Sequence, residues 1–98
     1  MTTNQIITFL KQNKQNFLHK YQITKIALFG SYARGENRKD SDIDILYSLK
    51  EGSKFTFDTY MEFENELKNA FNSKIDLINE KKLNPLIKMK AEKDFIYV

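Results

Sequence analysis

The chain has 98 residues, of which 41% are hydrophobic and 30% charged, with a formal net charge of +3 and no cysteine. Its length fits a single domain over residues 1–98, and the lack of cysteine excludes disulfides and thiolate metal sites. No apolar stretch approaches the roughly 20 residues of a membrane span, and the N-terminus is too polar for a signal peptide, so we expect a cytoplasmic protein without membrane contact.

The first half of the chain predicts a helix, two strands and a helical turn between the strands. Residues 4–21 carry apolar side chains at a roughly helical period. The short apolar run 25–29 is typical of a buried strand and ends at Gly30. Residues 31–34 fit one helical turn, and the apolar pattern of residues 43–49 is typical of a second strand.

The second half continues the alternation of helices and strands. Residues 57–71 place apolar side chains on one helical stripe, and residues 74–78 are a third strand candidate. A last helix is expected from near Pro85 to about residue 93, followed by an edge strand over residues 95–98. The order α-β-α-β-α-β-α predicts an α/β (α+β) fold with a small sheet flanked by helices. Since the turn between the first two strands is too short for a parallel crossover, we expect a mixed sheet.

Asp42 and Asp44 form the first candidate site. Side chains alternate along a strand, so the two carboxylates project from one face, with Cα atoms about 6.6 Å apart, while Ile43 and Ile45 enter the core. Two charges about 5 Å apart repel by an amount on the order of 3 kcal/mol at an effective dielectric near 20. A divalent cation turns that repulsion into attraction, and hard oxygen ligands select Mg²⁺, with Mn²⁺ as an alternative.

Asp76 is the third candidate acid, inside the apolar strand 74–78. A charge in such a strand is expensive unless it is paired or binds a metal. If this strand lies beside the strand of Asp42 and Asp44, the three carboxylates form a cluster suited to two ions, one activating the attacking oxygen and one stabilising a triphosphate. The alternative is an acid at a strand edge that faces water.

Gly30 and Ser31 form a second candidate site, for phosphate. Gly30 follows a buried strand and permits close approach of the backbone. If Ser31 opens a helical turn, its unpaired amide groups and hydroxyl suit a β- or γ-phosphate, and Arg34 lies one turn further on. Ser31 as a helix N-cap is the alternative, and both roles can coexist.

Three other motifs are excluded by the residues present. Gly30 and Gly35 match the glycine spacing of a P-loop, but Glu36 and Asn37 replace its lysine and hydroxyl residue. Ser31 lacks the flanking glycines of a nucleophile elbow. The acids from Asp40 onward match several EF-hand positions, but Ile45 stands where that loop requires glycine.

Three segments together resemble a known family: IALFGSYARG (residues 26–35), SDIDIL (residues 41–46) and KIDLI (residues 74–78). They are similar to the minimal nucleotidyltransferases of the DNA polymerase beta-like superfamily. The resemblance covers most of the chain and implies a nucleotidyltransferase fold with a mixed sheet. It also implies that Asp42, Asp44 and Asp76 are catalytic acids that bind metal, and that Gly30 and Ser31 hold the nucleotide phosphates.

Family members of this size often resemble the antitoxin half of HEPN/MNT toxin–antitoxin pairs. The resemblance therefore implies Mg²⁺-dependent transfer of AMP from ATP to a tyrosine of a HEPN toxin. We expect a homo- or hetero-oligomer, since 98 residues leave no space for an acceptor-binding domain, and no direct nucleic-acid contact, since no such signature is present. Two alternatives stay open, namely neutralisation of a HEPN toxin by binding alone and transfer to a small molecule.

Overall fold

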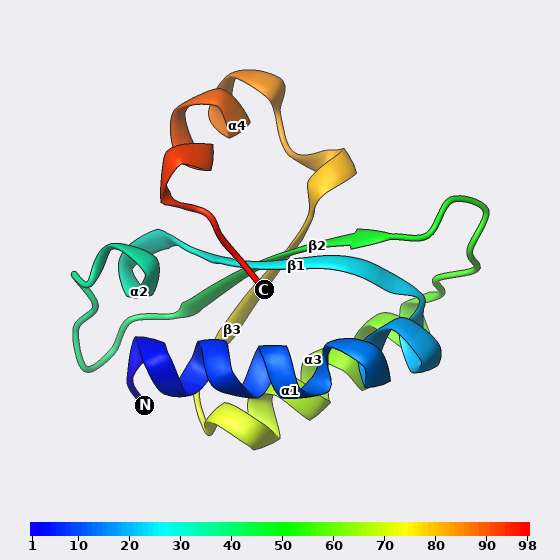
Figure 1. Ribbon diagram of the computed structural model, residues 1–98, viewed down its shortest axis with the longest axis horizontal. Helices are drawn as coiled ribbons and strands as arrows, with labels where there is room; N and C mark the ends of the chain where they lie inside the picture. Colours follow the sequence, from blue (N-terminus) through cyan, green and yellow to red (C-terminus); the bar gives the residue numbers. More distant parts are fainter.

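The computed structural model describes residues 1–98 and shows a four-stranded sheet with helices on both of its faces (Figure 1). In chain order the main elements are α1 (Thr3–Tyr21), β1 (Ile23–Phe29), α2 (Gly30–Arg34), β2 (Ile43–Leu49), α3 (Phe57–Phe71), β3 (Ile75–Asn79), α4 (Pro85–Ala91) and β4 (Ile96–Tyr97). Two short 3-10 helices, η1 (Glu80–Lys82) and η2 (Glu92–Asp94), flank α4. The predicted α-β-α-β-α-β-α order and the closing strand are confirmed.

The sheet has the strand order β3-β2-β1-β4 and is mixed, as predicted. β1 runs antiparallel to both β2 and β4, whereas β2 and β3 are parallel. The lengths of the connections explain these directions. α2 has only five residues and joins antiparallel strands, while the 15 residues of α3 make the long crossover that parallel strands need.

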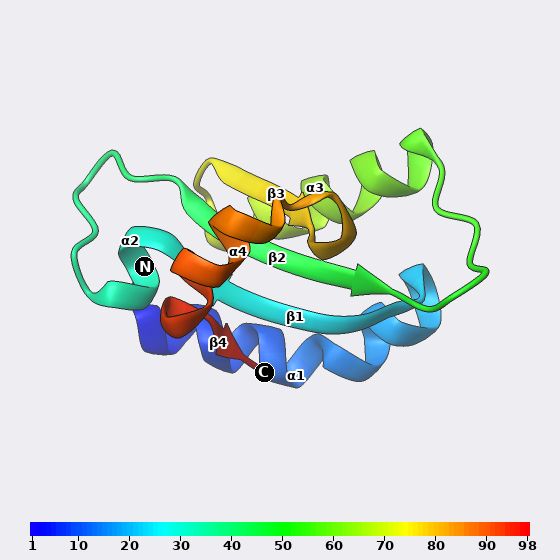
Figure 2. The same cartoon turned by 90° about the horizontal axis from the view of Figure 1, so that it is seen from above.

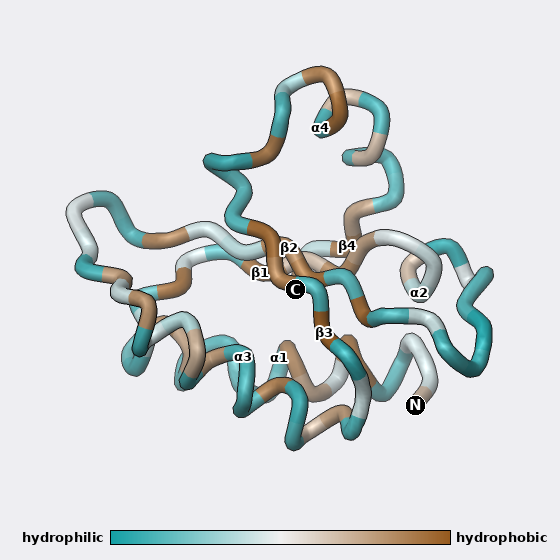
Figure 3. The backbone as a smooth tube through the Cα atoms, turned by 180° about the vertical axis from the view of Figure 1, so that it is seen from behind, coloured by the Kyte–Doolittle hydropathy of each residue, from teal (hydrophilic) through white to brown (hydrophobic).

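The hydrophobic core lies between the sheet and the two long helices α1 and α3, which cover the same face (Figures 1 and 3). Ile43 and Ile45 of β2 point into this core and are fully buried. The Phe63 ring of α3 lies at its centre, 5.3 Å from the ring of Phe17 on α1 and 5.8 Å from the ring of Tyr47 on β2, between ring centroids. Because alternate β2 residues face this core, Asp44 faces the other side of the sheet.

Several boundaries differ from the sequence prediction, those of α1, α2 and β4 by one residue at an end. β1 begins at Ile23, two residues early, because the buried Ile23 pairs with Leu49 beyond an irregularity next to Lys25. β3 is shifted by one residue, to Ile75–Asn79. The last helix ends at Ala91, and the 3-10 helix η2 takes its final turn.

The other face of the sheet carries α4 and its two 3-10 helices (Figures 1 and 2). Leu46 and Ala27 are buried on this face, but α4 itself contains no buried residue. None of the helices combines the length and the apolar character that crossing a membrane requires.

Candidate active site

Asp44 and Asp76 are direct neighbours across the parallel pair of strands β2 and β3. Neighbouring strands lie about 4.8 Å apart, and paired residues project from the same face, so the two carboxylates stand side by side. The flanking residues Ile43, Ile45 and Ile75 are buried on the opposite face. The predicted adjacency of the two acidic strands is confirmed, and the face that carries the acids is the one on which α4 lies.

The charges of all three predicted acids interact at this point. Burial, and then the negative charges of Asp76 and Asp42, raise the pKa of Asp44 to about 6, while Arg34 opposes the shift. Asp44 is partly exposed, whereas Asp42, just before β2, and Asp76 are exposed. The site therefore concentrates negative charge that a bound cation or a proton relieves.

The three carboxylates do not form a ready-made metal cage, because no group of three or more acidic or histidine side chains is close enough to hold an ion. The donor set nevertheless fits Mg²⁺, since it consists of carboxylate oxygens only and includes an adjacent, mutually repelling pair. Mg²⁺ commonly takes one or two carboxylates and completes its shell with substrate phosphates and water. The pair of Asp44 and Asp76 meets that requirement.

Gly30 lies directly against the Asp44 carboxylate. Its φ of +74° is in the left-handed region, and a Cβ atom on residue 30 would collide with Oδ2 of Asp44 and lie 2.9 Å from its Cγ. The contact follows from the sheet register, because Phe29 is paired with Asp44 and Gly30 comes next. Any side chain at position 30 would displace the carboxylate.

Helix α2 begins at Gly30 with no side chain capping its first turn. Phe29 is the N-cap residue and Ser31 occupies the second helical position, so the interpretation of Ser31 as a helix N-cap is wrong. The structure does bring Ser31 next to Gly30 and thus beside Asp44. The predicted phosphate-binding residues and the predicted acids are therefore assembled at one end of the sheet.

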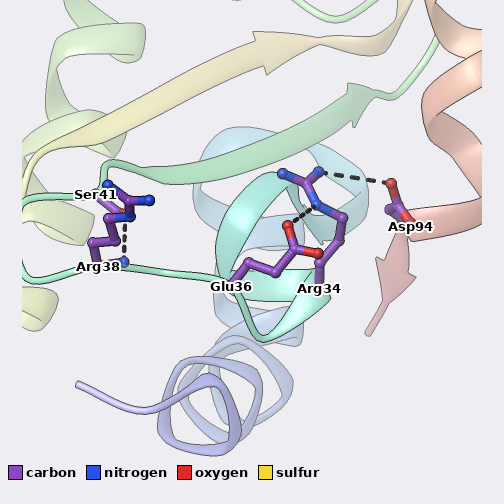
Figure 4. Close-up of polar contacts among 5 residues, drawn as sticks. All are labelled: Arg34, Glu36, Arg38, Ser41 and Asp94. Carbon is purple, nitrogen blue, oxygen red and sulfur yellow. Dashed lines mark hydrogen bonds and ion pairs between the residues drawn. The ribbon is translucent and has the colours of Figure 1, made fainter.

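Arg34 forms two ion pairs next to this site (Figure 4). Its Nε lies 3.1 Å from Oε2 of Glu36, and its Nη1 lies 3.7 Å from Oδ2 of Asp94 in η2. Sequence analysis did not identify Asp94, which is 60 positions away and carries no local signal. The pair with Asp94 links the site to the segment that contains α4.

The loop between α2 and β2 is ordered by a hydrogen bond of 2.7 Å, in which the backbone N–H of Arg38 donates to Oγ of Ser41 (Figure 4). A polar cavity of about 240 Å³ lies beside this loop and includes Asp42, Lys39 and Lys74 in its lining. Two larger cavities, of about 440 and 510 Å³, lie at the far ends of β2 and β3. We place the chemistry at the acids, because the larger cavities do not include them.

Comparison with known sequences places this site in context. The sequence profile of the family described as "Nucleotidyltransferase domain" matches residues 5–98. A Methanocaldococcus jannaschii protein, provisionally named a protein adenylyltransferase, is 41% identical over 98 residues. The match covers 99% of this chain and 98% of that protein, so the similarity includes the acids, Gly30 and the C-terminal segment.

Solved structures show the same fold at lower sequence identity. A minimal nucleotidyltransferase superposes with a TM-score of 0.79 at 24% identity, over 98% of this chain and 95% of that one. A second similar structure is a tri-AMPylated HEPN toxin of Shewanella oneidensis in complex with its MNT antitoxin. There the TM-score is 0.58 at 22% identity, over 97% of this chain and 66% of that one.

Proposed function

The chain belongs to the nucleotidyltransferase domain family, and from this premise we propose that it transfers AMP from ATP to a hydroxyl group of a HEPN-family partner protein. The observation that carries the proposal is the pairing of Asp44 with Asp76, with Gly30 directly against Asp44. Paired carboxylates beside a close backbone approach are what transfer of a nucleotidyl group requires.

The reaction is an in-line displacement at the α-phosphorus of ATP. The acceptor oxygen forms a bond to this phosphorus, the bond to the pyrophosphate oxygen breaks, and the hydroxyl proton is transferred to the Asp76 carboxylate. Asp76 suits this role because it is exposed on the outer strand, where an acceptor can reach it. Asp44 is more enclosed, between Gly30 and Asp76, and therefore suits binding of the nucleotide side.

Asp42, Asp44 and Asp76 are the residues that would hold Mg²⁺, as two ions in the proposed active complex. Bound Mg²⁺ supplies charge neutralisation of the triphosphate and of the attacking oxygen. The pKa of Asp44 is raised first by burial and then by the charges of Asp76 and Asp42, and a bound cation would offset both effects. The phosphates of ATP and water would supply the remaining oxygen ligands of the ion.

We assign nucleotide binding to Gly30, Ser31 and Arg34. The first amide groups of α2 have no side-chain cap, and Gly30, which carries no side chain, places them beside the Asp44 carboxylate. Arg34 is the one cation whose charge acts on Asp44, and its side chain is 41% exposed despite its two ion pairs. It is therefore free to rotate toward a triphosphate.

The partner is proposed from the named relatives. The related antitoxin structure contains an AMPylated HEPN toxin, and a close relative is provisionally named a protein adenylyltransferase. By analogy, we propose a tyrosine of a HEPN toxin as acceptor, a hetero-oligomer of enzyme and toxin, and an antitoxin role in which AMP transfer silences the toxin.

Incubation of the chain with α-labelled ATP, Mg²⁺ and the HEPN-family protein of the same genome tests the proposal. We expect label on the HEPN protein, and loss of labelling by a factor on the order of 100 or more with Asp44→Asn or Asp42→Asn. Glu62→Gln, an exposed acid on α3, is the matched control and should label normally. Undiminished labelling by the Asp44→Asn variant would exclude the proposed role of this carboxylate.

A non-catalytic antitoxin, which neutralises the toxin by binding, predicts a different result. In that case the Asp42→Asn and Asp44→Asn variants protect cells as well as the unchanged chain does. The Asp44–Asp76 pair favours the enzyme, since a purely binding protein has no use for two adjacent, mutually repelling carboxylates.

A further inference from the structure

Helix α4 presents an apolar surface to solvent. Leu86, Ile87 and Met89 are 68%, 56% and 69% exposed, and no residue of the helix is buried. Brown segments of α4 in Figure 3 stand well away from the sheet. A single large apolar side chain with this exposure is common on protein surfaces. Three of them within four residues form an apolar patch, and such patches mark interaction sites.

The helix forms because of local signals and not because of core packing. Asn84 caps it through its side chain, whose Oδ1 accepts from the backbone N–H of Leu86 at 2.8 Å, and Pro85 fills the first turn. An ion pair of 3.3 Å between Lys88 and Glu80 ties its middle to η1. A helix of seven residues is marginal by itself, so these contacts hold α4 in shape while its apolar residues point outward.

The patch is surrounded by positive charge. The segment from η1 to η2 contains five lysines, namely Lys81, Lys82, Lys88, Lys90 and Lys93. Of these five, only Lys88 forms an ion pair. Of its three acids, Glu80 pairs with Lys88 and Asp94 pairs with Arg34. The uncompensated lysines favour an acidic partner surface and oppose a second copy of this chain, because two such patches would repel.

The position of α4 connects the patch to the candidate active site. Both lie on the side of the sheet opposite α1 and α3, as Figures 1 and 2 show for α4. Asp94, three residues after α4, pairs with Arg34 beside the acids. A protein that binds α4 therefore approaches the face of the sheet on which Asp76, the residue assigned to the acceptor, is exposed.

We propose that the patch of Leu86, Ile87 and Met89, with its surrounding lysines, docks the acceptor protein through an acidic surface with an apolar centre. This proposal rests on the proposed function, of which it names the docking element. Docking at α4 turns attack by the acceptor hydroxyl into a reaction within one complex.

Calorimetric titration with the HEPN-family protein of the same genome tests the apolar part of the patch. The Leu86→Ser/Met89→Ser double variant should bind at least about tenfold more weakly. Phe57→Ser is the matched control, because Phe57 is 75% exposed and belongs to α3 and not to the patch, and binding by this variant should stay within about twofold. Circular dichroism and binding of a fluorescent ATP analogue verify that each variant is folded.

A second comparison tests the charges. Lys90→Glu/Lys93→Glu should weaken binding at least about tenfold at low salt and less at high salt. Lys11→Glu/Lys14→Glu makes the same change in charge on exposed positions of α1, across the sheet, and should have a much smaller effect. Binding within about twofold of the unchanged chain for both α4 variants would overturn the docking proposal, as would a lack of saturable binding by the unchanged chain.

Separate readouts keep the two proposals distinguishable. Asp44→Asn should bind the HEPN protein normally and lose AMP transfer. If the unchanged chain binds through α4 but transfers no AMP, docking at α4 stands and the proposed function fails. If AMP transfer occurs and the α4 variants transfer with unchanged KM for the HEPN protein, the docking proposal fails and the proposed function stands.

Discussion

The backbone of Gly30 lies in contact with the carboxylate of Asp44, at a separation that leaves no space for a Cβ atom. Phe29 and Asp44 are paired across β1 and β2, so the contact is fixed by the sheet register. The glycine thus lies on one side of Asp44, and Asp76 lies on the other side. A phosphate bound at the start of α2 would consequently lie next to the acids.

Gly30→Ala should damage the site more than the fold. The new Cβ displaces the Asp44 carboxylate, and φ of +74° adds strain of about 1–3 kcal/mol. We expect AMP transfer to fall by a factor on the order of 100, as for loss of a catalytic hydrogen-bond donor. Denaturant unfolding together with the labelling assay measures both effects.

Gly35→Ala is the matched control for this variant. Gly35 has almost the same φ, +72°, but nothing lies within 4 Å of its hypothetical Cβ. It should lose about 1 kcal/mol of stability and keep most of its activity. Equal losses of activity in the two variants would show that backbone strain, and not the contact with Asp44, explains the result.

Asp44→Asn should stabilise the nucleotide-free protein at pH 7. The pKa of Asp44 rises from 3.8 to about 6 on folding, so between these pH values the folded state binds more protons than the unfolded state. Stability therefore falls as pH rises through this window. After allowance for the partial exposure of Asp44, we expect a gain of about 1–2 kcal/mol at pH 7.

The pH dependence provides the control for this prediction. Near pH 4 Asp44 is protonated in the folded protein, so Asp44→Asn and the unchanged chain should have nearly equal stability. Urea titrations at both pH values, with a chelator present, measure the difference. A stabilisation that is the same at both pH values would point to packing and not to charge.

The best-predicted helices and strands have a regular pattern of apolar residues and end at residues that stop the element. β2 and α3 occur with the predicted bounds, and α3 is closed by a Thr56 cap and by Asn72 in the left-handed conformation. β1 was predicted too short, because the exposed Thr24 separates the buried Ile23 from the run 25–29. Pairing with a distant strand, which no local pattern reveals, decides that boundary.

Only part of the candidate site was predictable from local sequence, because the rest depends on which strands are neighbours. The alternation in β2 places Asp44 opposite the buried Ile43 and Ile45, and that inference needs only the strand itself. Its pairing with Asp76 required knowing which strands are neighbours, so it was only conditional. Neither the ion pair of Arg34 with Asp94 nor the outward apolar face of α4 has a local signal, since each depends on tertiary placement.

Arg34→Gln should weaken ATP binding more than catalysis. We assign the Arg34 guanidinium to the triphosphate, so its loss should raise KM for ATP by about tenfold, with a smaller decrease in kcat. Arg38→Gln is the matched control, because Arg38 lies in the neighbouring loop and is hydrogen-bonded through its backbone, while its side chain forms no ion pair. An unchanged KM in Arg34→Gln would exclude Arg34 from the nucleotide site.

Phe63→Ala should bring the whole domain close to unfolding. The Phe63 side chain is fully buried, and its ring packs against those of Phe17, Tyr21 and Tyr47, with centroids 5.3 to 5.8 Å away. Truncation leaves a cavity and costs about 3–5 kcal/mol, against about 5–15 kcal/mol for the whole stability of a typical domain. Urea titration measures the loss. Phe57→Ala, at a 75% exposed position of the same helix, is the control and should change the free energy of unfolding by no more than about 0.5 kcal/mol. A similar loss of stability in both variants would contradict the central position of Phe63 in the core.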